Sequence, residues 1–307
     1  MRWLNLHIGD RQLLGTVAAD DSVVFIDDAC RSAGVSVPVD TPDLVRAWLH
    51  DSDRLRRIVA SVSPASWRQR SDVKLASAVQ RPGKLLCLAG NYREHIVESG
   101  FAPVAVEDVI TPQMFLKPST CLIGDNAEVR LSPENVRVGW EVELAVVIGR
   151  SASRVSVASA MDHVFGYTIL NDLSERGLNS RLPGRRLRER DPFFDWLAGK
   201  WFDGFAPCGP WIVTADEIPD PHALELRLTV NGELRQRGTT ADMIFDIPTL
   251  IASASAIMTL EPGDIIATGT PAGAGIGTSE SVLRPGDQVV CEIDAIGALH
   301  TTIGEAA

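Results

Sequence analysis

The segment Val138-Gly-Trp-Glu-Val-Glu-Leu-Ala-Val-Val-Ile-Gly149 is an apolar run that carries two carboxylates separated by one residue. Short β-branched runs bounded by glycine are typical of buried strands. Because successive side chains of a strand point to opposite faces, we expect Glu141 and Glu143 on one face and Val142 and Leu144 on the other. The segment therefore predicts a core strand that brings two carboxylates to one place.

These two carboxylates raise the question of what neutralises them, because like charges this close repel and a divalent cation is the simplest remedy. A third carboxylate ends another apolar strand, Gly166-Tyr-Thr-Ile-Leu-Asn-Asp172. Hard cations prefer several carboxylate oxygens, so Glu141, Glu143 and Asp172 are the predicted ligands of Mg²⁺, with Mn²⁺ or Ca²⁺ as alternatives. The same pattern also fits an edge strand with a solvent face, on which alternating acidic residues are common, and Asp172 then becomes a turn residue.

Composition excludes several classes of protein. The 307 residues are 45% hydrophobic and 22% charged, with 25 Gly and 18 Pro, which is typical of a globular chain with many short strands. The net charge of −11 disfavours nucleic-acid binding. No stretch approaches the roughly 20 apolar residues that span a bilayer, and no secretory h-region opens the chain. Because the sequence shows neither pattern, we expect a cytoplasmic protein with no membrane partner. The five cysteines lack any C-x-x-C spacing, so we expect reduced thiols.

The chain divides by pattern near residue 75. Residues 1–75 predict a small N-terminal α/β domain, with helical periodicity over residues 43–60, whereas residues 76–307 contain many short β-rich segments and predict a mostly antiparallel domain. The predicted fold class is α+β. A helix is expected to start at a capping Asp246 followed by a first-turn proline. Its predicted buried face consists of Leu250, Ile251, Ala254, Ile257 and Met258.

A second polar cluster, Asn91-Tyr-Arg-Glu-His-Ile-Val-Glu98, follows an apolar strand. In a helix, His95 and Glu98 lie one turn apart on the same face. A carboxylate that orients an imidazole makes it a better base for deprotonating water. Taken alone, such a pair is more often a surface contact worth a few tenths of a kcal/mol.

Three further segments are candidates for ligand contacts. Lys200 stands among aromatic residues, so its ammonium either seeks a buried anion or its stem lies along apolar surface. The strand end Thr268-Gly-Thr-Pro-Ala-Gly-Ala-Gly275 allows close approach of backbone to a ligand, or is only a turn, and it matches no nucleotide-binding motif. The segment 181–190 carries five arginines, which predicts either a cationic flap that favours a dicarboxylate substrate or a solvated loop.

Taken together, these segments resemble the fumarylacetoacetate hydrolase family over roughly residues 84–300. The resemblance rests on seven motifs in the family's order: Gly90–Glu98, Phe115-Leu-Lys-Pro-Ser119, Glu141–Gly149, Gly166–Asp172, Asn231-Gly-Glu233, Met243-Ile-Phe245 and Pro262–Pro271. It implies a mixed β-roll catalytic domain in a homodimer, with a divalent metal held by Glu141, Glu143 and Asp172.

The resemblance also implies roles for other side chains. His95 and Glu98 match a dyad on a lid segment that activates water, and Lys200 and Thr270 match positions that bind substrate oxygens. Arg176 matches a substrate-binding arginine of the family. Asn179 stands where the family commonly has Gln, so the pocket is expected to differ in size.

The implied function is metal-dependent hydrolysis of a C–C bond in a small 2,4-dioxo acid, through a metal-stabilised enolate and a water activated by the His–Glu pair. The same site suits an oxaloacetate-type decarboxylase or a 2-hydroxymuconate-type isomerase or hydratase, since all of these use one electrophilic centre. A non-enzymatic metal-binding scaffold is a further alternative. The N-terminal region carries no comparable cluster and is expected to serve structure or an interface.

Overall fold

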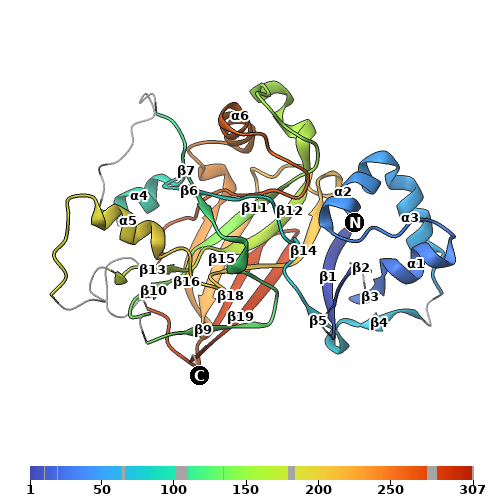
Figure 1. Cartoon of the computed structure of the whole chain (residues 1–307), viewed down its shortest axis with the longest axis horizontal. Coiled ribbons are helices and arrows are strands. Elements are labelled where there is room, and N and C mark those ends of the chain that lie inside the picture. Colours follow the sequence, from blue (N-terminus) through green and yellow to red (C-terminus); the bar gives the residue numbers. More distant parts are fainter. Residues whose placement is uncertain are drawn as a thin grey trace.

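The computed structural model describes residues 1–305, apart from residues 10, 19, 64–65, 101, 103–109, 134, 179–183 and 275–281. Within this part of the chain, the strands form a twelve-stranded sheet, a five-stranded sheet and a two-stranded ribbon, and six α-helices accompany them. The fold is α+β, as the sequence predicts (Figure 1).

The larger sheet contains β1 (Arg2–Ile8), β2 (Arg11–Val17), β3 (Ser22–Phe25), β4 (Arg68–Gln69), β5 (Lys74–Leu75), β6 (Leu85–Ala89), β7 (Gln113–Lys117), β8 (Leu122–Ile123), β11 (Val142–Ile148), β12 (Val164–Asn171), β14 (Ala206–Thr214) and β17 (Ile265–Ala267). Its order is β4-β3-β2-β1-β14-β12-β11-β17-β6-β7, with β5 beside β1 and β8 beside β14. The smaller sheet contains β9 (Ala127–Leu131), β15 (Glu225–Val230), β16 (Glu233–Thr239), β18 (Gln288–Ile293) and β19 (Gly297–Glu305). Its order is β16-β15-β18-β19-β9, while β10 (Val138–Gly139) pairs with β13 (Ser174–Glu175).

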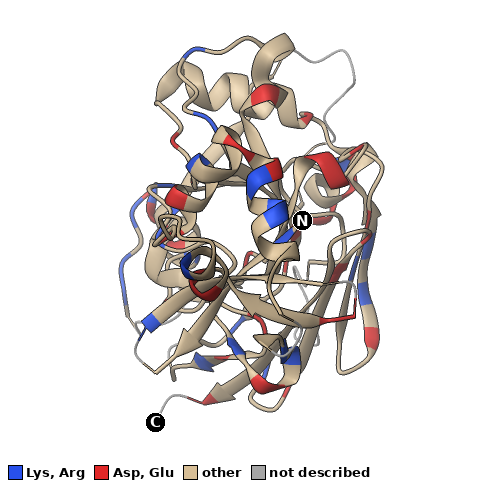
Figure 2. Cartoon of the chain, turned by 90° about the vertical axis from the view of Figure 1, so that its right-hand side faces the viewer, with Lys and Arg blue, Asp and Glu red and all other residues tan. Residues whose placement is uncertain are grey.

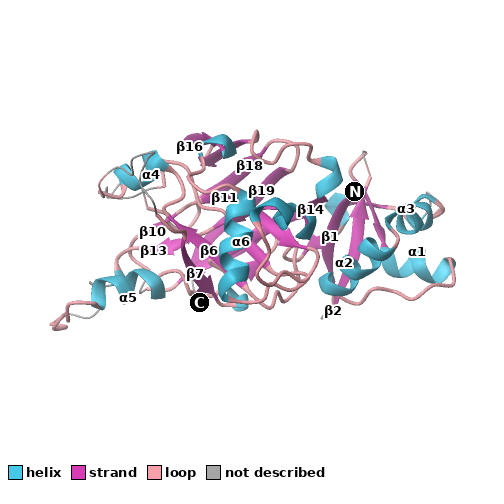
Figure 3. Cartoon of the chain, turned by 90° about the horizontal axis from the view of Figure 1, so that it is seen from above, coloured by secondary structure: helices cyan, strands magenta, loops and turns pink. Residues whose placement is uncertain are grey.

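The helices are α1 (Ile26–Ser32), α2 (Thr41–His50), α3 (Ser52–Ala60), α4 (Arg93–Glu98), α5 (Asp191–Ala198) and α6 (Ile247–Ile257). Pairing in the described strands is mostly antiparallel, as predicted, with parallel pairs at β8–β14, β6–β17 and β9–β19. Figures 1 and 3 place α1, α2 and α3 at one end of the molecule and α4 and α5 at the other. The two polar segments that the sequence singles out around His95 and Lys200 therefore lie far from the N-terminal helices.

Strand β11 lies in the middle of the larger sheet, between β12 and β17, and all of its residues are buried. Leu144 and Val146 belong to a core cluster shared with the smaller sheet, whereas Ala145 and Val147 belong to a second cluster on the opposite face, shared with α2. Burial on both faces explains why the strand reads as a continuous apolar run. The edge-strand interpretation of this segment is therefore wrong.

The N-terminal strands extend the larger sheet. Strand β1 pairs with β14 in antiparallel register, with Arg2 opposite Val213 and Trp3 opposite Ile212. Ring contacts reinforce the junction, because Trp48 of α2 lies edge-on both to Trp3 and to Phe165 of β12. We propose that residues 1–75 form a small N-terminal domain, whose strands belong to the same sheet as β6, β11 and β17.

Two helical segments show where local pattern succeeds and fails. Residues 43–60 are divided between α2 and α3 at Asp51, whose side chain accepts the backbone N–H of Arg54 at 2.8 Å and so starts a new helix. Helix α6 starts as predicted, since Asp246 accepts the N–H of Thr249 at 2.9 Å. The prediction that Ile257 is buried is wrong, because this last-turn residue is 78% exposed. The helical period determines the direction in which a side chain points around the helix axis. Whether that side chain is buried depends on which other elements pack against that turn of the helix.

Acidic and basic residues are interspersed along the ribbon that faces the viewer in Figure 2. No helix in the described ranges is long and apolar enough to cross a membrane.

Two ion pairs of different burial join the N-terminal region to the rest. The fully buried carboxylate of Asp125 lies 2.5 Å from Nη2 of Arg70 and accepts the N–H of His300 at 2.7 Å. The pair of Arg56 with Asp216 is equally short at 2.5 Å, but its side chains are 35% and 55% exposed.

We expect Asp125→Ala to lower the free energy of unfolding by about 3 kcal/mol, because it removes the short ion-pair partner of a largely buried guanidinium, whose other carboxylate, Asp21, lies 3.8 Å away, and leaves the N–H of His300 unpaired. The matched variant Asp216→Ala removes an exposed pair and costs at most ~1 kcal/mol. Chemical denaturation of the full chain measures both values. Equal losses in the two variants would contradict this assignment of the junction.

Candidate active site

Three carboxylates meet beside the central strand of the larger sheet. Glu141 directly precedes β11, Glu143 lies within it, and Asp172 directly follows the neighbouring β12. Two hydrogen bonds join these strand ends. The backbone N–H of Glu141 donates to the side chain of Asn171, and the backbone carbonyl of Glu141 accepts the N–H of Asp172, each at 2.9 Å. Ligand oxygens of the three residues all lie within 4.8 Å of one another, and all three residues are buried. The predicted cluster thus exists in space.

Three cations surround this cluster. The Nζ atom of Lys200 lies 2.9 Å from Oε2 of Glu141 and 2.7 Å from Oδ2 of Asp172. Lys117 donates to Oδ1 of Asp172 at 2.5 Å and to two backbone carbonyls at 2.8 Å and 3.2 Å. Arg176 contacts the other oxygen of Glu141. Both lysines are almost completely buried, so their charges are weakly screened by solvent.

The cations do not act equally on the three acids. Burial favours protonation of Glu141, but the charges of Lys200 and Arg176 outweigh it and lower the pKa of Glu141 to about 2. For Glu143, burial and then the charges of Asp172 and Glu141 raise the pKa well above its usual value. Burial would lower the pKa of Lys200, yet the carboxylates of Asp172 and Glu141 raise it, so this ammonium stays charged. Glu143 is therefore the acid whose charge is least compensated.

The contacts of Glu143 provide a test of whether the cluster suits a metal. Its Oε2 accepts the N–H of Gly269 at 2.8 Å, but its buried Oε1 has no hydrogen-bond partner among the described residues. Gly269 has φ of 89°, and a Cβ there would lie 2.8 Å from Cβ of Asn91, so glycine allows this close approach. An unpaired buried oxygen within an all-oxygen set of three carboxylates fits a hard divalent cation.

The predicted dyad lies on the short helix α4. Nδ1 of His95 lies 3.6 Å from Oε2 of Glu98, and the same oxygen accepts the N–H of Gly273 at 2.8 Å. Burial would raise the pKa of Glu98, but the contacts with His95 and Gly273 outweigh it, so the carboxylate is charged at neutral pH. The side chain of Asn91 fixes the start of this segment by donating to the carbonyl of Thr268 at 2.8 Å.

A chamber of about 730 Å³ opens beside the cluster. It is lined by His95, Glu141, Arg176, Lys200 and Thr270, so five of the predicted site residues face one space. The hydroxyl of Thr270 donates to the carbonyl of Val142 and accepts from the side chain of Gln236, both at 2.8 Å, so its proton is already engaged. Asn179, the remaining predicted substrate residue, lies outside the described residues.

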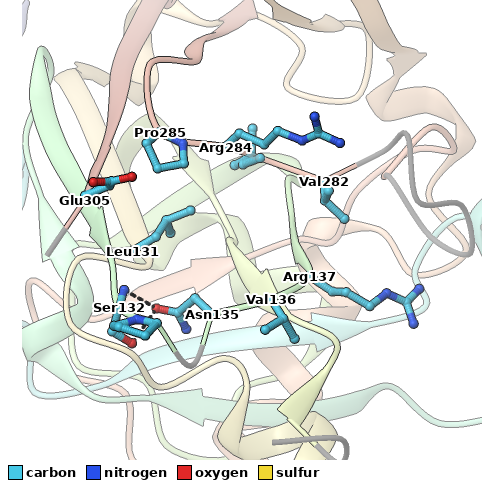
Figure 4. A pocket seen from close by; sticks show the side chains of 11 residues that line it. Leu131, Ser132, Asn135, Val136, Arg137, Val282, Arg284, Pro285 and Glu305 are labelled. Carbon is cyan, nitrogen blue, oxygen red and sulfur yellow. Dashed lines mark hydrogen bonds between the residues drawn. The ribbon is translucent and has the colours of Figure 1, made fainter.

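A second hollow of about 830 Å³ lies away from the cluster. It is lined by residues 131–133, 135–137 and 282–285 together with Glu305. Figure 4 shows the guanidinium groups of Arg137 and Arg284 directed to the same side of this hollow. Among the described residues, none of the predicted site residues lines it, so the chamber beside Glu141 is the candidate active site.

Lys117 is the main residue that sequence reasoning missed. It ends the edge strand β7 within Phe115-Leu-Lys-Pro-Ser119, a segment that was assigned no chemical role. A lysine inside an apolar strand was an available signal, since a buried ammonium requires an anion. Gln236 and Asn171, which hold Thr270 and Glu141, gave no signal because amides are common throughout the chain.

The sequence and the fold of this chain are similar to those of known proteins. The family profile described as fumarylacetoacetate (FAA) hydrolase C-terminal matches residues 84–304. Oxaloacetate tautomerase FAHD2A, mitochondrial, of Homo sapiens is 40% identical over 245 residues, which are 80% of this chain and 73% of that protein. The structure of maleylpyruvate hydrolase from Sphingobium sp. SYK-6 in complex with manganese (II) ion and pyruvate has a TM-score of 0.75 and 31% identity, covering 100% of both chains. That of 5-carboxymethyl-2-hydroxymuconate delta-isomerase from Mycobacterium smegmatis has a TM-score of 0.71 and 32% identity, again covering 100% of both.

Replacement of Glu143 by Gln separates charge repulsion from metal binding. In EDTA we expect the Glu143→Gln variant to melt at the same temperature as the wild type or higher, because a neutral amide replaces a carboxyl whose ionised form is disfavoured by burial and by the neighbouring carboxylates. Addition of Mn²⁺ stabilises the wild type by about 2.7 kcal/mol at 100 times its Kd, and this gain is lost in the variant. Thermal unfolding with and without metal measures both effects.

Glu98→Gln is the matched control, since Glu98 is close by but outside the carboxylate cluster. It is expected to keep the metal-induced shift of the wild type. A normal shift in Glu143→Gln would rule out this residue as a ligand.

Proposed function

This chain belongs to the fumarylacetoacetate hydrolase family, and we propose that it is a divalent-metal-dependent enzyme that hydrolyses a C–C bond in a small 2,4-dioxo acid. The observation that carries the proposal is the cluster of three buried carboxylates, one without a countercharge, next to a chamber lined by His95, Arg176 and Lys200. Such a reaction needs carboxylates to hold a metal, positive charge to bind the substrate oxygens, and a base. The carboxylate cluster, the two cations and the imidazole around this chamber are groups of these three kinds.

Glu141, Glu143 and Asp172 would hold the cation, with Mg²⁺ as the expected metal and Mn²⁺ or Ca²⁺ as alternatives. The related maleylpyruvate hydrolase structure, which contains a manganese (II) ion and pyruvate, supports both a divalent metal and a 2-oxo acid. When bound, the cation supplies Lewis-acid stabilisation of negative charge that develops on a substrate oxygen.

Lys200 and Arg176 would bind the 2-oxo acid head. Both reach the chamber, and both are already directed at the carboxylate of Glu141, so their charges are concentrated at its inner end. Positive charge held there stabilises the enolate oxygen that forms when the neighbouring C–C bond breaks. Because Thr270 has its hydroxyl proton engaged, we propose that it shapes the chamber and accepts from substrate rather than donating.

His95 would act as the base. Nδ1 of His95 lies 3.6 Å from the charged carboxylate of Glu98, which is beyond hydrogen-bond distance, and it has no other partner among the described residues. We therefore propose that Glu98 orients the imidazole through its charge, with His95 lining the chamber. The base takes a proton from water as the water oxygen adds to the C4 carbonyl of the substrate. The C3–C4 bond then breaks, its electron pair forms the enolate of the 2-oxo acid, and the proton is returned to C3, which yields two smaller acids.

Tautomerisation or isomerisation of a 2-oxo acid is the second candidate. It is favoured by the 40% identity to an oxaloacetate tautomerase and by the isomerase structure. The same imidazole would move a proton between carbon and oxygen without any water. Decarboxylation of an oxaloacetate-type acid would proceed through the same enolate. If the protein is instead a metal-binding scaffold without activity, no metal-dependent turnover is expected.

A homodimer in the cytoplasm remains part of the proposal. The family resemblance supports the homodimer. The burial of all five cysteines as free thiols suits a reducing compartment such as the cytoplasm. Sedimentation of the purified chain measures the subunit number.

Replacement of His95 tests the proposed base. With Mn²⁺ present, we expect His95→Ala to lower kcat for C–C hydrolysis roughly 10²- to 10⁴-fold, because general-base catalysis is lost, while decarboxylation of oxaloacetate is largely spared. The exposed His50 of α2 is the matched control, and His50→Ala is expected to behave as the wild type. Retention of hydrolysis in His95→Ala would remove this residue from the mechanism.

A further inference from the structure

Helix α5 presents an aromatic wall to the chamber. Phe193, Trp196 and Lys200 are spaced by three and four residues and lie on one side of this segment. The ring of Trp196 lies 5.8 Å from that of Phe193 and 5.2 Å from that of Phe115. Nζ of Lys200 lies 5.4 Å from the Phe115 ring and 5.9 Å from the Trp196 ring. Aromatic rings therefore lead without interruption from the ammonium at the inner end to Phe193, which is 58% exposed.

One glycine brings this wall to the site. The backbone N–H of Glu175 in β13 donates to the carbonyl of Gly199 at 2.9 Å. A Cβ on Gly199 would lie 2.1 Å from the carbonyl oxygen of Glu175. Only glycine permits this approach, and it places the end of α5, with Lys200, against the carboxylate cluster.

The charged groups of the chamber are gathered at one place in the described part of the chain. Besides Phe193 and Trp196, the apolar lining includes Leu88, Ile96 and Phe245, and the neutral polar lining consists of Ser99, Thr111, Gln113 and Thr270. The described charged groups of the lining are Glu141, Arg176 and Lys200, with His95 as the neighbouring titratable group. Arg176 and Lys200 both contact Glu141, so the chamber has a charged inner end and, along α5, an aromatic wall without a described cation.

The arginine-rich segment does not alter this division where it is described. Arg185 pairs with Asp195 of α5 at 2.8 Å, and Arg188 pairs with Asp191 at 2.9 Å. The described arginines between residues 184 and 190 do not line the chamber. The described part of this segment therefore gives no support to a cationic flap for a dicarboxylate, because Arg185 and Arg188 pair with acidic residues of α5 and neither Arg186 nor Arg190 lines the chamber. Arg181 lies outside the described residues.

We propose that this enzyme selects 2-oxo acids with an apolar far end, an alkyl or aryl group, over those that end in a second carboxylate, and that Phe193 and Trp196 determine this specificity. The inference rests on the proposed function, because it requires the 2-oxo acid head to lie at Lys200 and Arg176. An apolar tail gains free energy by leaving water for the aromatic wall. A tail carboxylate loses its hydration there and meets no described cation.

Three acids that share one 2,4-dioxo head test the proposal in the full chain with Mn²⁺: 2,4-dioxo-4-phenylbutanoate, 2,4-dioxopentanoate and 2,4-dioxohexanedioate. We expect kcat/KM for the phenyl acid to exceed that for the dioate at least about tenfold, with the short acid in between. Preference for the dioate, or equal values, would overturn the inference and leave the proposed function intact. No turnover of any of the three with Mg²⁺ or Mn²⁺ would instead overturn the proposed function.

Two neighbouring variants locate the determinant. Phe193→Arg places a cation at the outer wall, so the ratio of kcat/KM between phenyl acid and dioate is expected to fall at least about tenfold. Phe194→Arg is the matched control, since Phe194 is 55% exposed on the same helix but does not line the chamber, and its ratio is expected to match the wild type. Equal ratios in the two variants would overturn the role of Phe193.

Discussion

Three carboxylates buried within 4.8 Å of one another are the constraint on which the rest of this structure depends. Charges of one sign repel strongly where water is excluded, so the fold must deliver opposite charge to the same place. It does so from three separate elements: Lys117 from the end of β7, Arg176 after β13, and Lys200 after α5. Each of the three contacts Glu141 or Asp172, whereas no described cation contacts Glu143. One buried oxygen of Glu143 is left without a partner among the described residues, and the proposed metal site rests on this feature.

The position of β11 explains how such a cluster can be rigid. A central strand with a neighbour on each side has its backbone fixed by two ladders, and its apolar side chains are packed on both faces. Glu141 and Glu143 inherit this rigidity, and Asp172 gains it through reciprocal bonds with the start of β11. Loops and short helices then contribute what has to meet the substrate. His95 and Glu98 come from α4, a helix of six residues, and the aromatic wall comes from α5. The carboxylate cluster thus lies on the sheet, while the proposed base and the aromatic wall lie on the helices around it.

The proposed substrate preference follows from the division of the chamber into a charged inner end and an aromatic wall. A charged inner end is suited to a 2-oxo acid head, whatever bond is later broken or moved. The aromatic wall differs from the inner end in polarity, and α5 supplies Phe193 and Trp196 while Lys200 follows two residues after its end. Change along a single helix can therefore alter the accepted tail while the reaction centre is kept. The placement of the N-terminal helices at the other end of the molecule agrees with a structural role for that region (Figures 1 and 3).

Local rules of the chain account for much of this arrangement. The period of two in a strand places Glu141 and Glu143 on one face, and the end of an apolar run marks Asp172. The helical period pairs His95 with Glu98, and a capping Asp246 marks the start of α6. Each of these predictions depends only on residues that are near in sequence. The ordered motifs between residues 84 and 304 were also sufficient to indicate the family. Tertiary structure alone decided that Lys117 shares Asp172 with Lys200, that Asp51 divides one periodic stretch into two helices, that Ile257 stays exposed, and that Arg185 and Arg188 pair with α5. Those outcomes depend on which distant groups compete for the same neighbour or cover the same turn, and the identity of a competitor is set by packing rather than by spacing along the chain.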